Sequence, residues 1–295
     1  MRYAKPPLNL DGQIALLRSR GLLVSDVDKA KNYLSNISYY RLSAYMLPLK
    51  EPGSDNFLPD TDFQDVLNLY LFDREFRILV FDAIERLEIA FRTQIIYHPS
   101  LVGGAFWFED GTYFDDPYRQ ADHLQKIDDE VYRATEVFKD HFFSKYDEHA
   151  RMPAWMTFEV VSLGLLSKIY RNLKMSSAKK DISKHFGLPQ PYILESWMQS
   201  ITYVRNVCAH HSRLWNRVLT LRPQRLKKPN NLWISDSPPN DKMYYFLCCI
   251  LYLLRSINPR TRFVLHLKTL LDRYPNLPLQ SMGFPQDWKN EAFWQ

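Results

Sequence analysis

Glycine and cysteine are both scarce in this chain. Only nine glycines occur in 295 residues, which is few for a protein rich in tight turns and strand connections. The three cysteines, Cys208, Cys248 and Cys249, form no even framework and no C-x-x-C pair with partner histidines. This pattern excludes a disulfide scaffold, disfavours a zinc site and favours a reducing compartment.

Long apolar runs and a strong excess of one charge are also missing. The longest apolar run, Met243 to Leu254, has 12 residues, whereas a membrane-spanning helix needs about 20. The first seven residues contain no apolar leader segment. We therefore expect a cytoplasmic protein with no membrane partner. The net charge of +5 is small for this length, so any nucleic-acid contact must depend on where the cations lie.

What the chain does contain is hydrophobic residues spaced three and four apart. They make up 46% of the sequence when aromatics are included, and their period is that of amphipathic helices. The prediction is an all-α fold. We expect a small N-terminal helical unit at residues 1–50, a main helical domain at residues 61–275 and a tail at residues 276–295.

Caps and breakers give the helix ends. Gly21 should stop the first helix, and Ser25 with Asp28 should open the second as a capping box. Asp116-Pro117 supplies an N-cap and an N1 proline, and Pro99 should end the preceding long helix at His98, before an ordered loop. The expected helices are residues 11–20, a second after 25, 38–47, 61–97, 117 toward 141, 154–170, 178–186, 191–215, 244–254 and 261–274.

The helix expected from residue 191 carries an arginine and a histidine separated by four residues. At 100° per residue, Trp197, Ile201, Val204 and Cys208 form one apolar stripe. Asn206 and His210 lie opposite that stripe, four residues apart, so the Asn206 amide can orient the imidazole. Arg205 lies on the flank of the helix. His211 lies at the edge of the stripe and is expected to pack.

An Arg and a His at this spacing are most often a salt bridge and a surface residue. The charge environment shifts the balance, because no acidic residue occurs between Glu195 and Asp236. Such a stretch attracts phosphate. Tyr203, Trp215 and Trp233 lie within it and could stack on unpaired bases, although tryptophan at helical spacing is more often core. The candidate RNA-binding cations are Arg213, Arg217, Arg222, Arg225, Lys227 and Lys228.

A second cluster lies on the long helix expected at residues 61–97. Glu85, Glu88 and Arg92 share one face, because they are three and four residues apart. The simplest interpretation is an intrahelical ion pair. The functional alternative is that this face packs beside Arg205 and orients it, with Glu88 and Arg92 as supporting residues. Arg92 and His98 form a second, weaker Arg and His pair.

Several separated segments resemble the Abi-like family of bacterial abortive-infection proteins, of the AbiD and AbiF type. Each is weak alone, but together they are specific and extend from near the start to about residue 217. They are Lys5-Pro6-Pro7 with Gln13, Leu17 and Arg20-Gly21-Leu22; Tyr39 to Tyr45; Leu69-Tyr70 with Phe72-Asp73-Arg74; Ile84 to Glu88 with Arg92-Thr93; Ser162-Leu163-Gly164 with Leu166-Ser167; and Val204 to Trp215.

The family belongs to the HEPN superfamily, whose signature is Arg, a polar residue, three others and His. Arg205, Asn206 and His210 match it position by position. The resemblance implies a HEPN-like helical bundle and metal-independent RNA cleavage. It also implies a composite site where two motifs meet, as in type VI CRISPR nucleases. Because this chain has one convincing motif, we expect a homodimer whose second copy supplies the other.

The resemblance thus implies an endoribonuclease that acts on RNA without metal or other cofactor. Its catalytic residues would be Arg205, Asn206 and His210, with Glu88, Arg92 and His211 in support. Family context suggests phage defence or a toxin role, held in check by an inhibitory RNA or a protein antitoxin. Two alternatives stay open: a non-catalytic RNA-binding or regulatory protein, and a helical scaffold whose dimer buries the polar face.

Overall fold

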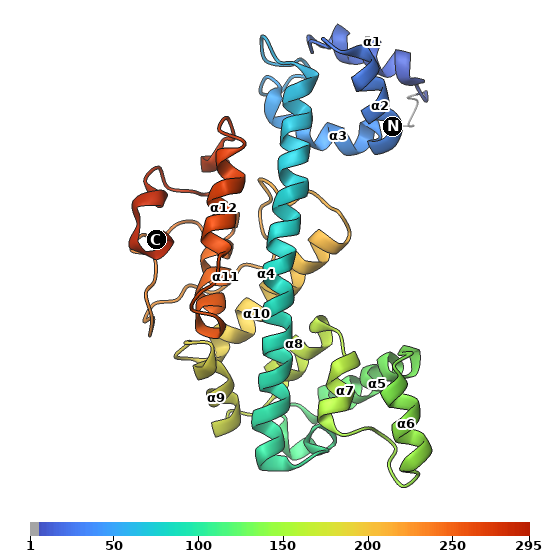
Figure 1. Ribbon diagram of the computed structural model, residues 1–295, viewed down its shortest axis with the longest axis vertical. Helices are drawn as coiled ribbons and strands as arrows, with labels where there is room; N and C mark the ends of the chain where they lie inside the picture. Colours follow the sequence, from blue (N-terminus) through green and yellow to red (C-terminus); the bar gives the residue numbers. More distant parts are fainter. Residues whose placement is uncertain (1–5) are drawn as a thin grey trace. The chain divides into compact units, whose positions relative to one another are not determined.

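The structure describes residues 6–295 of the computed structural model, and their regular secondary structure consists of helices joined by loops (Figure 1). No β-strand forms among them, only isolated bridges, and the all-α prediction is confirmed. The helices are α1 (Leu10–Ser19), α2 (Val27–Ile37), α3 (Tyr39–Met46), α4 (Phe63–Gly103), α5 (Pro117–Arg133), α6 (Val137–Lys145), α7 (Ala154–Val160), α8 (Leu163–Asn172), α9 (Ser177–His185), α10 (Pro191–Ala209), α11 (Met243–Ile257) and α12 (Phe263–Asp272).

The chain divides into two compact units. The smaller contains the residues up to Arg77 together with Thr269–Leu277, and the larger contains Ile78–Lys268 and Pro278–Gln295. The division falls inside α4, which is continuous. None of the helices within residues 6–295 combines the length and the apolar character needed to cross a membrane.

Side-chain caps define the helices of the smaller unit. Asn9, Asp26 and Ser38 accept hydrogen bonds from main-chain N–H groups at the starts of α1, α2 and α3. The prediction that Ser25 caps the second helix is wrong by one residue. The Ser25 hydroxyl instead donates to Asp62 at 2.6 Å, and this bond ties the loop before α2 to the loop before α4.

The Tyr39 to Tyr45 segment packs its last tyrosine into the core of the smaller unit. The Tyr45 hydroxyl donates to Asp73 Oδ2 at 2.6 Å, and Arg77 forms an ion pair with the same carboxylate. All three side chains are buried. Burial and the Asp73 charge raise the pKa of Tyr45 well above its usual range. Tyr40, by contrast, is exposed.

Helix α4 continues past the expected end at His98. It includes Pro99 and ends at Gly103. The predicted loop therefore begins after Gly103 and not at residue 98. A proline inside a helix removes one main-chain hydrogen bond, and here the helix resumes at once: Gly104 N–H donates to the Ser100 carbonyl at 2.9 Å. Gly104 then leaves the helix with a left-handed φ of +76°.

Two helices expected to be continuous are interrupted. The helix from Pro117 ends at Arg133, and α6 begins only at Val137, because Ala134 adopts an extended conformation. The helix predicted over residues 154–170 breaks into α7 and α8 at Val161 and Ser162, both extended. Within the larger unit, α8 packs against both α5 and α10.

The core of the larger unit centres on α11. All residues from Met243 to Leu254 are buried, which explains why this run is apolar on every face. The three cysteines are buried, and desolvation raises the pKa of the Cys248 and Cys249 thiols far above the ordinary value.

Candidate functional site

Helix α10 presents the Arg205 motif as its periodicity predicts. Trp197, Ile201, Val204 and Cys208 are buried. Arg205 lies at the edge of this stripe, with 39% of its side chain exposed, and Asn206 faces solvent. The apolar stripe therefore fixes the rotation of the helix, and that rotation leaves the polar part of the motif outside the core.

The helix ends inside the motif, at Ala209, and not at Trp215 as expected. His210 is the C-cap residue, and His211 adopts a left-handed φ of +54°. The His211 N–H donates to the Cys208 carbonyl and the Ser212 N–H to the Val207 carbonyl, both at 3.0 Å. This is the Schellman arrangement, with histidine where glycine is usual.

The turn exposes both histidines. His210 is exposed, as predicted, but His211 is exposed too, and the expectation that it packs is wrong. The reason is that the chain leaves the helix at His210, so the helical wheel no longer applies one residue later. Among the described residues, no hydrogen bond joins the side chains of Asn206 and His210.

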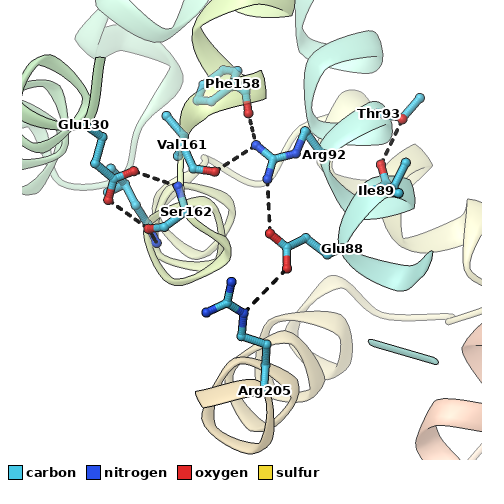
Figure 2. A network of polar contacts seen from close by, with 10 residues as sticks. Glu88, Ile89, Arg92, Thr93, Glu130, Phe158, Val161, Ser162 and Arg205 are labelled. Carbon is cyan, nitrogen blue, oxygen red and sulfur yellow. Dashed lines mark hydrogen bonds and ion pairs between the residues drawn. The ribbon is translucent and has the colours of Figure 1, made fainter. Parts of the chain in front are cut away.

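Glu88 of α4 lies between two arginines. Its Oε2 is 3.9 Å from Arg205 Nε, and its Oε1 accepts a hydrogen bond from Arg92 Nη2 at 3.2 Å (Figure 2). The Arg205 guanidinium also lies over the Phe81 ring, 5.9 Å from its centroid. The predicted intrahelical pair of Glu88 and Arg92 is thus present, and the same carboxylate also contacts Arg205.

Arg92 is anchored to the main chain. Its Nη1 donates to the carbonyls of Phe158 and, at 2.8 Å, Val161. Phe158 lies in the last turn of α7, and Val161 lies in the break between α7 and α8 (Figure 2). A helix break leaves carbonyls without intrahelical partners, and a guanidinium can satisfy two of them at once. The break therefore fixes Arg92, Arg92 fixes Glu88, and Glu88 lies against Arg205.

A second carboxylate holds the start of α8. Glu130 of α5 accepts from the Ser162 N–H at 2.6 Å and from the Ser162 hydroxyl at 2.8 Å (Figure 2). Ser162 directly follows Val161, whose carbonyl binds Arg92. A negative charge at a helix N-terminus is favourable. The break between α7 and α8 is thus held by polar contacts on both sides.

The basic stretch is less open to phosphate than its sequence indicates. Arg217 donates to the Arg213 carbonyl at 2.7 Å and to the Tyr203 hydroxyl at 3.1 Å. Arg222 lies 3.6 Å from Asp241, because the loop folds back to the start of α11. Arg225 donates to Ser237, whereas Lys227 and Lys228 are exposed. Although the sequence between Glu195 and Asp236 contains no acidic residue, the fold brings the acidic side chain of Asp241 close to Arg222.

The aromatic residues proposed to stack on bases make contacts within the protein instead. Trp215 is fully buried. Trp233 stacks on Trp197 at 5.7 Å between ring centroids and meets Tyr252 edge-on. The Tyr203 hydroxyl is occupied by Arg217. The structural interpretation of the two tryptophans is the correct one.

Sequence reasoning missed one residue beside the motif. Phe81 and Ile78 are large apolar residues of the long helix, whose apolar spacing favours burial, but both are exposed. The buried face of this part of α4 runs through Val80, Ile84, Leu87 and Phe91 instead. The spacing of Glu85, Glu88 and Arg92 was visible in the sequence, but only the fold brings Phe81 to Arg205.

No cluster of three or more His, Cys, Asp or Glu side chains arranged to hold a metal ion occurs among residues 6–295. The family model for Abi-like proteins matches residues 32–216, which is more than half of the chain. The chain belongs to the Abi-like protein family.

Membership in the Abi-like family suggests a role in abortive infection. The matched segment contains Glu88, Arg92, the break between α7 and α8, and the whole Arg205 motif. No curated protein and no solved structure matches the chain.

Proposed function

We propose that this Abi-like protein is a metal-independent endoribonuclease of the HEPN type. The observation that carries the proposal is the placement of its motif: Arg205 is held by Glu88 at the edge of the core, and His210 lies exposed where α10 ends. His210 follows Arg205 by five positions, about 7.5 Å along the helix axis. One phosphodiester can bridge that distance.

The chemistry follows from the residue types. Arg205 binds the scissile phosphate and offsets the charge that grows on it in the transition state. A ribose 2′-oxygen attacks phosphorus and the bond to the 5′-oxygen breaks, which leaves a 2′,3′-cyclic phosphate and a 5′-hydroxyl. One imidazole removes the 2′ proton and another protonates the 5′-oxygen. The exposed Asn206 amide can orient the histidine or the ribose.

In this mechanism the two proton transfers are assigned to two histidines in opposite protonation states. Each chain offers one His210, so the complete site is proposed to form in a homodimer, with the two motifs facing across a two-fold axis. The two-fold arrangement of the motifs is the one that the resemblance to the HEPN signature implies. The cellular setting proposed with it is the cytoplasm, phage defence by cleavage of RNA, and restraint by an inhibitory RNA or a protein antitoxin.

The test is cleavage of RNA by the purified protein, with and without EDTA. We expect cleavage that EDTA does not reduce and products that end in cyclic phosphate or 3′-phosphate. His210→Ala and Arg205→Ala should lower the rate by about 100-fold or more. His266→Ala is the matched control, because it removes an exposed histidine from α12 of the same unit and should leave the rate unchanged. Activity that requires a divalent cation would contradict the mechanism.

A non-catalytic RNA-binding protein gives a different result. The parent would bind RNA and not cleave it, and His210→Ala would keep the affinity. A scaffold would bind no RNA at all, and neutralising Arg213, Arg217, Arg222 and Arg225 together would change nothing. Cleavage that is lost in His210→Ala while RNA binding persists supports the nuclease.

A further inference from the structure

Phe81 differs from the other phenylalanines of α4. Phe72, Phe76 and Phe91 are fully buried, whereas Phe81 is 38% exposed. An exposed phenylalanine on a helix contributes little to the core. Its only described ring contact with a charged group is the Arg205 guanidinium. The ring is therefore accessible beside the group proposed to bind the scissile phosphate.

The geometry suits a nucleobase. Arg205 covers part of the Phe81 ring at 5.9 Å and also leaves part of the ring open, as the exposed fraction shows. In a nucleotide the base and the phosphate are joined through one ribose. A protein that holds the phosphate on a cation thus brings the neighbouring base within reach of an aromatic ring beside that cation.

The charges around the ring favour a base over a second phosphate. Asp82 is paired with Arg86 at 2.6 Å, and Glu88 with Arg92 and Arg205. The exposed Glu85 lies one helical turn from Phe81. A carboxylate repels phosphate and tolerates the polar edge of an uncharged base.

We propose that Phe81 is the stacking platform for the unpaired base next to the phosphate that Arg205 binds. This deepens, and rests on, the proposed ribonuclease function. Bases in a duplex are stacked on each other and closed to side chains. The substrate class that follows is RNA that is single-stranded at the point of cleavage.

The test compares binding of two probes to the His210→Ala protein, which keeps Arg205 and Phe81. One probe is a short single-stranded oligoribonucleotide, and the other is the same ribose-phosphate chain without bases. Adding Phe81→Ala should weaken binding of the first about 5- to 150-fold and leave binding of the abasic chain unchanged. Phe81→Trp should retain the affinity for both probes.

Two further variants control for side effects. Phe81→Leu keeps an apolar side chain of similar size without a π face, and should show the same selective loss. Ile89→Ala removes another exposed apolar side chain from α4, about two turns away, and should change neither affinity. Circular dichroism establishes that each variant is folded.

An equal loss for both probes, or no loss for either, would overturn the stacking proposal, because Phe81 would then act on Arg205 alone or not at all. Cleavage by the unmutated protein is measured separately. If that protein binds RNA without cleaving it, the nuclease proposal fails while the comparison of the two probes can still be read.

Discussion

The carboxylate of Glu88 on α4 lies 3.9 Å from the Nε of Arg205 on α10. That distance is an ion pair and not a hydrogen bond, and the buried Arg205 Nε has no hydrogen-bond partner among the described residues. The Arg205 side chain as a whole is 39% exposed. Arg205 is therefore oriented by charge and by the Phe81 ring while its outer nitrogens stay available to a ligand.

Removing the Glu88 charge should loosen Arg205 and leave Arg92 without its acidic partner. Glu88→Gln keeps the shape of the side chain and is expected to lower the free energy of unfolding by about 1–3 kcal/mol, since a neutral amide oxygen replaces the negative charge in a partly buried ion pair. If the nuclease proposal holds, cleavage should fall by about 10-fold. Chemical denaturation and initial rates are the measurements.

Glu85→Gln is the matched control for stability. Glu85 lies on the same helix but is exposed, so its replacement should change the free energy of unfolding by less than about 0.5 kcal/mol. Equal effects of the two substitutions would mean that the contact between Glu88 and Arg92 is not a structural one.

Arg92 should be among the least replaceable charged residues of α4. It is 9% exposed and binds two main-chain carbonyls and Glu88. Arg92→Lys keeps the charge but cannot make three contacts in one plane, and we expect a loss of about 2–4 kcal/mol in chemical denaturation. Arg86→Lys changes an exposed pair with Asp82 and should cost less than about 0.5 kcal/mol. A loss in Arg92→Lys no larger than that of Arg86→Lys would contradict the anchoring.

The contacts of Arg92 also mark the limit of sequence reasoning. The 3.6-residue period was enough to place Trp197, Ile201 and Val204 in the core and Asn206 outside it, because those properties are local to one helix. The carbonyls that hold Arg92 lie 66 and 69 residues away in the chain. Main-chain acceptors carry no residue signature, so no pattern could identify them.

The errors in the predicted helix ends have a related cause. The break at Val161 and Ser162 is held by Glu130 and Arg92 from other helices. Arg222 meets Asp241 only because the loop folds back. In each case tertiary contacts outweigh the local preference.

The turn between α2 and α3 should become more stable when Ser38 is replaced by glycine. Ser38 adopts φ +68° and ψ +146°, a region that side chains other than glycine enter at a cost of about 1–3 kcal/mol. Its cap bond to the Arg41 N–H is long, at 3.4 Å, and a glycine cap costs only a few tenths of a kcal/mol. Ser38→Gly should therefore raise the free energy of unfolding by about 1 kcal/mol.

Thermal unfolding measures this effect, and Ser43→Gly is the control. Ser43 lies inside α3, where glycine costs up to about 1 kcal/mol, so the two substitutions should shift the melting temperature in opposite directions. A lower melting temperature in Ser38→Gly would show that the cap bond outweighs the strain.

Acid should destabilise the fold through His123 of α5. The side chain is 5% exposed, and its Nδ1 has no hydrogen-bond partner among the described residues. Burial lowers the pKa of His123 below its ordinary value of 6.5, and the charges of Lys126, Lys168 and Arg119 lower it further, against the opposing effect of Asp122. In the unfolded chain the imidazole takes up a proton near pH 6.5, whereas in the folded protein it takes up the proton only at a lower pH. Stability from this group is thus complete above pH 6.5 and is lost as the pH falls toward the folded-state pKa.

Urea unfolding between about pH 5 and pH 7.5 measures this loss as a slope. One proton gives at most about 1.4 kcal/mol per pH unit. His123→Gln should flatten the slope whatever its effect on absolute stability, since the titrating group is gone.

His185 should supply part of the remaining pH dependence of stability, because burial lowers its pKa as well. Lys168→Gln removes a cation that lowers the His123 pKa and should make the slope shallower without abolishing it. If His123→Gln retained the slope of the parent, the acid sensitivity would have to come from other groups, and the buried imidazole would be protonated as readily in the folded chain as in the unfolded one.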